Sequence, residues 1–393
     1  MVLKVLSILL IIKSMESEVE SQRFFNNHVL LFQSPRIRSR IDEKVQHQYS
    51  ERSNFFCDLR YGARSHTVPK DVHKLTPGDI DIVAALGDSL TVGLNANARN
   101  LFHIGSEDRG VSWSIGGQDT WRQILTLPNI LKAYNPKLYG YSLNDSPERT
   151  SGFNFAVTSS MSSQTVNQAK HLVTRMINDR NVDVQKQWKL ITYMTGANDF
   201  CSGICRQHDT NVILNNAARD LITTLRILKA YLPRTLVNVV FPPNVNILTK
   251  LKNAPLKCGI IHTFACPCLF NPTYASQRER ILRTIKLWKE RIVEVVQLPE
   301  FHDSEEFEVN VHPFLDKADL PRLQNGNTDM SYLSPDCFHF TPKGHALLTN
   351  ALWNSMLTPE NHRSRSLRKE FEDFKCPTAS LPYLATSKNI WQN

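Results

Sequence analysis

The chain has 393 residues, of which 41% are hydrophobic and 21% are charged, a composition typical of a globular protein that buries a large core. Its formal net charge is +9, and the basic residues at 36–44 and 363–369 have no interleaved aromatic side chains, so we interpret them as solvated surface rather than as nucleic-acid contacts. A positive potential also favours contact with anionic lipid surfaces.

The first residues predict a secretory signal peptide. Lys4 provides a basic start, and residues 5–12 form an apolar run that is too short to span a bilayer. We expect residues 1–17 to be the signal, and the alternative is an uncleaved extension ahead of a start at Met15. No other segment has a transmembrane run or a terminal apolar anchor, so we expect a secreted, soluble product.

Residues 82–86 form an apolar run that predicts a strand buried on both faces, and the run ends at Gly87. Glycine lets the chain bend sharply there. Ser89 is then expected at the carboxyl edge of a parallel sheet, where ligands of open α/β sheets bind. Its hydroxyl can act as a nucleophile beside a base and an oxyanion site, or it can cap the helix predicted at residues 90–98.

The rest of the chain alternates predicted strands and helices. Strands are expected at residues 154–157, 188–195, 235–241 and 308–314, and helices at residues 120–132, 164–177, 212–232, 278–296 and 343–356. This alternation predicts an α/β fold, a three-layer α/β/α sandwich with a doubly wound parallel sheet of the flavodoxin-like type. The domain is placed at residues 71–376, after a lead-in at residues 18–70 fixed by Cys57, and residues 377–393 are a tail.

Eight cysteines indicate an oxidising compartment. Local spacing predicts short pairings of Cys201 with Cys205, and of Cys258 with either Cys266 or Cys268. The partners of the other cysteines stay open. Because no Cys-x-x-Cys doublet occurs and no histidine stands at ligand spacing, we do not expect a zinc site.

Two further motifs carry side chains suited to acyl transfer. Asp336-Cys-Phe-His339 places a carboxylate where it can accept from the imidazole Nδ1–H and leave Nε2 free as a base. Asn198, which follows the strand predicted at residues 188–195, can direct its amide into the cleft as an oxyanion donor. The alternatives are an incidental pair on a surface loop and an Asn/Asp turn. The concurrence of these motifs with Ser89 at strand ends favours the chemical reading.

With these residues in view, the chain resembles the GDSL, or SGNH, hydrolase superfamily and, within it, the membrane-associated type of phospholipase B. Gly87-Asp-Ser-Leu90, Gly196-Ala-Asn-Asp199 and Asp336-Cys-Phe-His339 match the first, third and fifth motif blocks of that superfamily. Further matches are Val72-His-Lys-Leu75, Trp113-Ser-Ile-Gly-Gly117, Thr126-Leu-Pro-Asn-Ile130, Asn135-Pro136 and Cys266-Pro-Cys268. The resemblance covers about residues 57–376.

The resemblance implies an SGNH hydrolase-like fold and a serine hydrolase site. Ser89 would be the nucleophile, His339 the general base and Asp336 the residue that orients it. Asn198 would donate to the oxyanion, together with the backbone N–H groups of Ser89 and of Ser159 in the second block. Neither a cofactor nor a metal is implied.

The second block departs from the superfamily pattern. Asn-x-Ala-x-x-Gly reads Asn154-Phe-Ala-Val-Thr-Ser159 here, so Ser159 stands where the oxyanion glycine is usual. Its N–H is retained, but a positive φ would cost serine about 1 kcal/mol or more. His345 is a rival base without an acidic residue three positions before it, and we assign it a structural role. Asp88 and Asp199 are interpreted as carboxylates that hold loops.

Together these features predict a secreted carboxylic ester hydrolase of the phospholipase B type. Its substrates would be acyl esters of phospholipids or lysophospholipids, cleaved through an acyl-enzyme in transient contact with a membrane or lipid surface. The alternatives are a short-chain or carbohydrate esterase, and a catalytically weakened derivative that binds lipid or a partner, which the residue at position 159 would explain.

Overall fold

The structure, a computed structural model, describes residues 43–144 and 151–389. The chain divides into two compact units, Met1–Val45 and Gln46–Asn393. Almost all of the first unit, including the signal peptide predicted at residues 1–17, lies outside the described residues. The fold is therefore that of the second unit.

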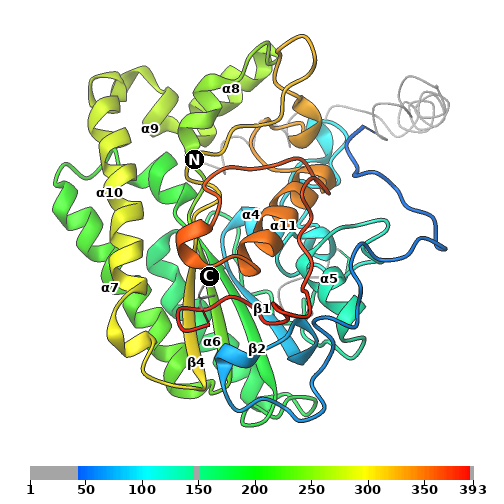
Figure 1. Ribbon diagram of the computed structural model, residues 1–393. Helices are drawn as coiled ribbons and strands as arrows, with labels where there is room; N and C mark the ends of the chain where they lie inside the picture. The colour runs from blue at the N-terminus through cyan, green and yellow to red at the C-terminus, as the bar shows by residue number, and fades with distance from the viewer. Residues whose placement is uncertain (1–42, 145–150, 390–393) are drawn as a thin grey trace, which may run out of the picture. The chain divides into compact units, whose positions relative to one another are not determined.

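Four parallel strands form the central sheet of this unit, in the order β1-β2-β3-β4 (Figure 1). They are β1 (Ile80–Gly87), β2 (Trp188–Met194), β3 (Thr235–Val240) and β4 (Phe307–His312). Every residue of β2, β3 and β4 is buried, as expected for strands covered on both faces. These four strands confirm the corresponding predictions, with small differences at their ends.

The strand predicted at residues 154–157 does not form. The segment reaches β1 only through isolated contacts, such as the parallel bridge between Ala85 and Asn154. The left-handed backbone of Gly152, with φ of 62°, bends the chain just before this bridge, so no continuous ladder develops. Because alternate N–H groups of a strand point to opposite edges, this segment flanks the edge of β1 that faces away from β2. The chain order therefore reverses at β1, and the sheet is doubly wound as predicted.

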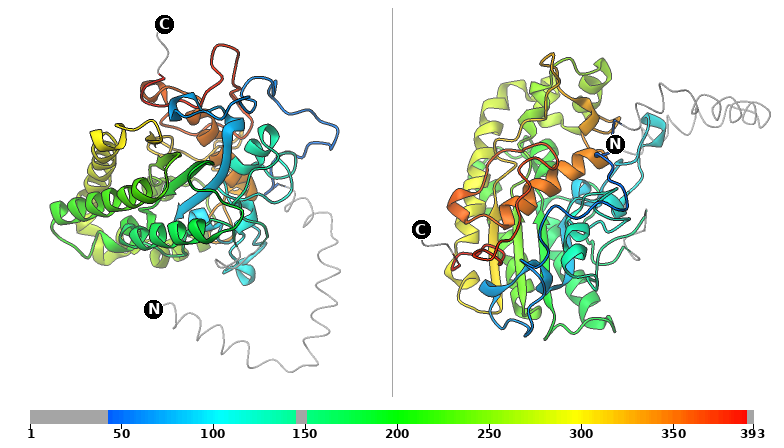
Figure 2. Two further views of the ribbon diagram at one scale, coloured as in Figure 1. Left: turned by 90° about the horizontal axis from the view of Figure 1, so that it is seen from below. Right: turned by 45° about the vertical axis from the view of Figure 1, so that its right-hand side comes forward.

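Helices cover both faces of the sheet and complete the predicted α/β/α sandwich (Figure 2). On one side, α6 (Thr165–Asn178), α7 (Thr210–Tyr231) and α10 (Arg278–Val296) pack on one another; on the other, α5 (Leu127–Tyr134) packs on α11 (Pro342–Met356). In α7, Leu214, Leu221, Leu225 and Leu228 are buried at helical spacing. This apolar stripe is the pattern from which the sequence predicted the helix.

Two helices are shorter than predicted. The helix α4 (Ser89–Val92) ends because Gly93 takes a left-handed conformation, with φ of 78°. The helix α5 begins only at Leu127, where Thr126 caps it by accepting a hydrogen bond from the N–H of Asn129 at 3.2 Å.

Sequence reasoning missed two helices between β3 and β4, namely α8 (Leu256–Ala265) and α9 (Pro267–Phe270). Several apolar residues of α8 face outward, so the helix lacks the core-facing period by which helices are found in a sequence. None of the helices in the described ranges has both the length and the apolar character needed to cross a membrane.

All eight cysteines form disulfides, and both predicted pairings are wrong. The bonds join Cys57 to Cys376, Cys201 to Cys266, Cys205 to Cys268 and Cys258 to Cys337. Cys201 and Cys205 lie about one helical turn apart, in and after the helical segment η7 (Asp199–Gly203), which packs against α9. Each therefore bonds a cysteine at α9 rather than its own neighbour.

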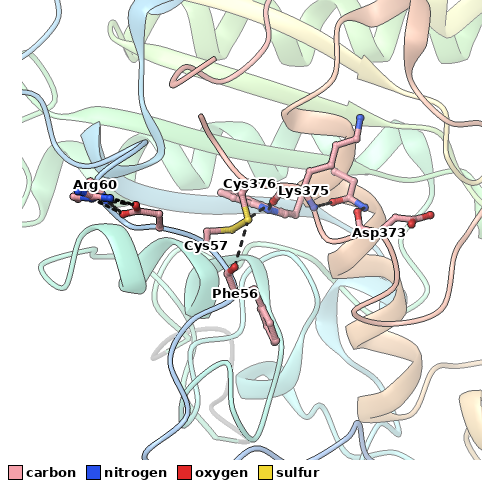
Figure 3. Close-up of a disulfide and its surroundings, with 9 residues drawn as sticks. Phe56, Cys57, Arg60, Asp373, Lys375 and Cys376 are labelled. Atoms are coloured by element: carbon pink, nitrogen blue, oxygen red, sulfur yellow. Dashed lines mark hydrogen bonds and ion pairs between the residues drawn. A yellow bond between two sulfur atoms is a disulfide. The ribbon is translucent and has the colours of Figure 1, made fainter. Parts of the chain in front are cut away.

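The bond between Cys57 and Cys376 joins the lead-in to the C-terminal segment across 319 residues (Figure 3). Aromatic rings pack beside it: Tyr49, Phe55 and Phe56 contact Trp121, Phe371 and Phe374. The compact unit thus begins at Gln46, ahead of the domain boundary placed at residue 71.

Replacing both Cys57 and Cys376 with serine should lower the free energy of unfolding by about 3–5 kcal/mol, because the bond closes a very long loop in the unfolded chain. Equilibrium unfolding in urea, followed by tryptophan fluorescence with the other disulfides intact, measures the change. A double variant that unfolds at the wild-type urea concentration would show that aromatic packing alone fixes the lead-in.

Candidate active site

Ser89 lies where β1 turns into α4. Gly87 ends the strand, and a Cβ at this position would lie 2.5 Å from the carbonyl oxygen of Met194, so only glycine fits. Asp88 caps the helix, because its Oδ1 accepts a hydrogen bond from the N–H of Leu90 at 3.0 Å. Ser89 is the first residue of α4 and is 5% exposed. Its hydroxyl is therefore fixed at the carboxyl edge of the sheet.

A chain of hydrogen-bonded side chains ends at this hydroxyl. Nε2 of His339 lies 2.9 Å from Oγ of Ser89, and Nδ1 lies 2.7 Å from Oδ2 of Asp336. Because a carboxylate can only accept, Nδ1 carries a proton and Nε2 accepts from the serine O–H. The structure thus brings together three side chains that the sequence places in two distant motifs.

Hydrogen-bond donors surround the carboxylate of Asp336. Its Oδ1 accepts from the backbone N–H groups of Phe338 and His339, each at 3.0 Å, and its Oδ2 also accepts from Nδ2 of Asn95 at 2.6 Å. Burial alone would raise the pKa of Asp336, but the hydrogen bond and charge of His339, with the two N–H groups, hold that pKa well below its usual range. The side chain is therefore ionised at neutral pH and fixes the imidazole ring.

Asn95 is a site contact that sequence reasoning missed. It is buried and has a left-handed backbone, with φ of 62°. Its Oδ1 accepts from the N–H of Gly105 at 2.6 Å, and its carbonyl accepts from the hydroxyl of Ser334 at 2.8 Å. Asn95 therefore joins the loop after α4 to the loop that carries Asp336. The only sequence signal was an asparagine in a polar stretch, which is also typical of ordinary turns.

The groups predicted to form the oxyanion site lie in adjoining segments. Nδ2 of Asn198 donates to the carbonyl oxygen of Ser160 at 2.9 Å, which uses one of its two protons. In the part of the chain that the structure describes, the backbone N–H groups of Ser89 and Ser159 donate no hydrogen bond. Three donors are thus available at this edge of the sheet for a ligand oxygen.

Ser159 takes the left-handed conformation, with φ of 63°, for which glycine is preferred. The strain expected for a serine with positive φ is therefore present, at about 1 kcal/mol or more. Its side chain is exposed, so the loop has room for the hydroxymethyl group.

Gln168, on α6, ties this loop to the end of β1. Its Oε1 accepts from the N–H of Gly87 at 2.9 Å, and its Nε2 donates to the carbonyl of Gly87 at 2.9 Å and to Oγ of Ser160 at 3.0 Å. Asp199 holds the same loop by accepting from the N–H and hydroxyl of Ser162, at 3.0 and 2.8 Å. Sequence reasoning missed Gln168, because a single polar residue on a helix gives no distinctive signal.

His345 lies apart from the hydrogen-bonded chain. It is buried on α11, and its Nδ1 accepts a hydrogen bond from the N–H of Trp113 at 3.3 Å. Burial lowers its pKa to about 3, so the ring stays neutral and serves as a structural acceptor. Within residues 43–144 and 151–389, no cluster of three His, Cys, Asp or Glu side chains is placed to share a metal ion.

Comparisons with known proteins agree on one family. Residues 83–352 match the family described as GDSL-like lipase/acylhydrolase. Membrane-associated phospholipase B1 of Mus musculus is 35% identical over 350 residues, which cover 87% of this chain and 23% of the relative. The Homo sapiens protein of the same name is 35% identical over 340 residues, which cover 86% of this chain and 23% of the relative. The chain thus spans just under a quarter of the length of these relatives.

Two solved structures also overlap with this chain. An extracellular lipase from Streptomyces rimosus gives a TM-score of 0.30 at 13% identity, covering 67% of this chain and 94% of its own. A phospholipase A1 from Streptomyces albidoflavus gives a TM-score of 0.30 at 14% identity, covering 68% and 95%.

Asp88 should make the stability of the protein depend on pH. Its Oδ2 is buried and has no hydrogen-bond partner among the described residues. Burial raises the pKa of Asp88 from an ordinary value of about 4 to about 7. Because the folded state binds this proton more tightly than the unfolded state does, protonated Asp88 adds to the free energy of unfolding. This contribution is complete below about pH 4 and is lost as the pH rises through about 7.

Asp88→Asn should remove this pH-dependent loss of stability. The asparagine oxygen can still accept the hydrogen bond that caps the helix, and the amide has no charge whose burial costs free energy. We expect the variant to unfold at a higher urea concentration than the wild type at about pH 8, and the difference to disappear near pH 4. Urea unfolding across this pH range measures both proteins. A difference that does not change with pH would contradict the assignment.

Proposed function

The chain belongs to the GDSL-like lipase/acylhydrolase family of carboxylic ester hydrolases, and on that premise we propose that it is a secreted enzyme of the phospholipase B type. Its substrates are acyl esters of phospholipids or lysophospholipids, and the reaction passes through an acyl-enzyme. The observation that carries the proposal is the 2.9 Å contact between His339 Nε2 and Ser89 Oγ, on a ring held by an ionised Asp336.

In the first step, His339 acts as general base and removes the proton of Ser89, whose Oγ attacks the ester carbonyl carbon. The imidazole becomes an imidazolium, and the charge of Asp336 stabilises it without taking the proton. His339 then gives the proton to the departing alcohol oxygen, which is the glycerol oxygen of the lipid. The acyl group remains on Ser89.

The negative charge that develops on the carbonyl oxygen is assigned to three donors, namely Nδ2 of Asn198 and the backbone N–H groups of Ser89 and Ser159. Their support is the hydrogen bonding of the loops, which fixes these groups before substrate arrives. Fixed donors are effective because they need no reorganisation as charge develops. Water activated by His339 then attacks the acyl-enzyme and releases the fatty acid.

The apolar surroundings of the site favour a lipid acyl chain. A cavity of about 40 Å³ lies against Leu90 and Phe338, which adjoin Ser89 and His339 in the chain. Apolar residues make up most of its lining, among them Val245, Leu248 and Phe340. The phospholipase B1 relatives support the same substrate class. A short-chain or carbohydrate esterase remains the alternative, since this cavity alone is smaller than a fatty acyl chain.

Secretion is supported by the cysteines. Four disulfides form among the described residues, and such bonds persist in oxidising compartments. The apolar run at residues 5–12 supports the same route.

A fluorophosphonate probe, which reacts with activated serines, should label the folded, disulfide-intact protein at Ser89. Labelling should vanish in Ser89→Ala and slow by about 10²–10⁴-fold in His339→Ala, because the general base is lost. Ser366→Ala, a surface serine variant, should label like the wild type. In-gel fluorescence with time measures the rates.

Failure of the wild type to label would overturn the serine hydrolase assignment. In the same preparation, hydrolysis of esters with increasing acyl length, acetylated sugars and a diacyl phosphatidylcholine ranks the substrates. Rates that fall steeply with acyl length would favour the short-chain esterase over the phospholipase.

Ser159→Gly should turn over an ester substrate as fast as the wild type or faster, because glycine takes the left-handed conformation without strain and keeps the N–H donor. Ser159→Ala is the matched control and should behave like the wild type, since alanine has the same backbone strain as serine. Steady-state kcat on one soluble ester compares the three proteins. A large loss in the glycine variant would contradict this account of the loop.

A further inference from the structure

Three large apolar side chains project into solvent from one face of α8. Leu256 is 93% exposed, Ile260 is 65% exposed and Phe264 is 64% exposed. A spacing of four residues places them in a stripe along the helix. Single exposed apolar residues are ordinary, but an ordered stripe of this kind marks an interaction surface. We refer to these three residues as the α8 stripe.

The charged residues of the chain segment that carries α8, from Lys250 to Arg278, are all basic, and the exposed Glu279 follows directly after that segment. Between residues 241 and 278 the sequence contains no Asp or Glu. Its Lys and Arg side chains in that stretch are all exposed, namely Lys250, Lys252, Lys257 and Arg278. An apolar stripe with basic flanks complements a surface that is anionic outside and apolar beneath, as a leaflet with acidic phospholipids is.

The helix α8 is attached to the loop that carries Asp336 and His339. Cys258 bonds Cys337, which lies between Asp336 and His339 in the chain. A hydrogen bond provides a second contact, because Nε2 of His262 donates to the carbonyl oxygen of Cys337 at 2.9 Å. In Figure 1, α8 lies toward the end of the unit at which β1 runs into α4. The α8 stripe therefore has a fixed relation to Ser89.

Two cavities lie beside the α8 stripe and beside the site, and they have one lining residue in common. A cavity of about 590 Å³ opens beside α8, and Leu256 of the stripe forms part of its wall. Leu248 lines both this cavity and the small cavity against Leu90 and Phe338. The larger cavity falls within the size range of small-molecule sites, so it has room for part of an acyl chain.

We propose that the α8 stripe, with its basic flanks, docks the protein onto an anionic phospholipid surface. Leu256, Ile260 and Phe264 insert among the acyl chains, and the lysines and Arg278 contact acidic headgroups. Only the purpose of docking, which is to present lipid esters to Ser89, rests on the proposed function. Binding itself needs no chemistry and can be measured without it.

Binding is therefore tested in full-length Ser89→Ala protein, which cannot turn over lipid. The protein should co-sediment with vesicles that contain phosphatidylcholine and phosphatidylserine at a molar ratio of about 7:3. It should bind more weakly to vesicles of phosphatidylcholine alone. Adding Leu256→Ser, Ile260→Ser and Phe264→Ser should weaken binding to the mixed vesicles by about tenfold or more.

Two variants separate the apolar and basic contributions. Ile177→Ser with Tyr231→Ser removes exposed apolar residues from α6 and α7 and should leave vesicle binding unchanged. Lys250→Glu, Lys252→Glu and Lys257→Glu should abolish the preference for phosphatidylserine. Because all these side chains are exposed, the variants should fold, and circular dichroism checks that they do.

Activity distinguishes failure of docking from failure of the proposed function. In the Ser89-containing protein, the stripe variant should hydrolyse a water-soluble ester at the wild-type rate and mixed vesicles at least about tenfold more slowly. Vesicle binding without hydrolysis in the wild type would sink the proposed function and leave docking intact. If the stripe variant binds vesicles as well as the wild type does, the docking proposal is overturned. It is also overturned if light scattering shows that the only effect of the stripe substitutions is to dissociate a dimer.

Discussion

The hydrogen bond between His339 and Ser89 places the strictest demand on this fold, because its partners stand 250 residues apart. β1 fixes Ser89, whereas the loop of His339 has neither strand nor helix of its own. That loop is held instead by Asn95, which donates to Asp336, and by the Cys258–Cys337 bond. Since a hydrogen bond weakens within a few tenths of an ångström, these contacts decide whether the base can reach the nucleophile.

The loop of Ser160, on the oxyanion side of the site, is held by buried polar contacts from α6 and from the segment after β2. Gln168 joins the end of β1 to the Ser160 loop, and Asn198 and Asp199 hold the same loop from the end of β2. In a low-dielectric setting such a satisfied network is stiff, so backbone donors keep their direction. Some buried polar atoms near this network have no partner in the described structure, among them the second carboxylate oxygen of Asp88 and the hydroxyl of Thr195. The raised pKa of Asp88 is the kind of local cost that gathers at functional sites.

Much of this arrangement could be predicted because parallel strands all end at one edge of a sheet. Local patterns located β1 to β4, and the motifs after them named Ser89, Asn198, Asp336 and His339. Long-range pairing could not be predicted in the same way, since nothing in the spacing of Cys201 and Cys205 shows that they face α9. Gln168 and Asn95 escaped for a related reason: each bonds groups that only the folded chain brings near.

The attachment of α8 also limits what lipid docking can do. A covalent bond and a hydrogen bond both join α8 to Cys337, so a large movement of the helix would carry the His339 loop with it. A lid that swings away to open the site is therefore incompatible with an intact Asp336–His339–Ser89 chain, whose two hydrogen bonds are formed in this structure. Docking is expected to orient a preformed site against the leaflet instead. Docking brings the site close to its substrate. It should therefore strengthen substrate binding and leave the rate of the chemical step unchanged.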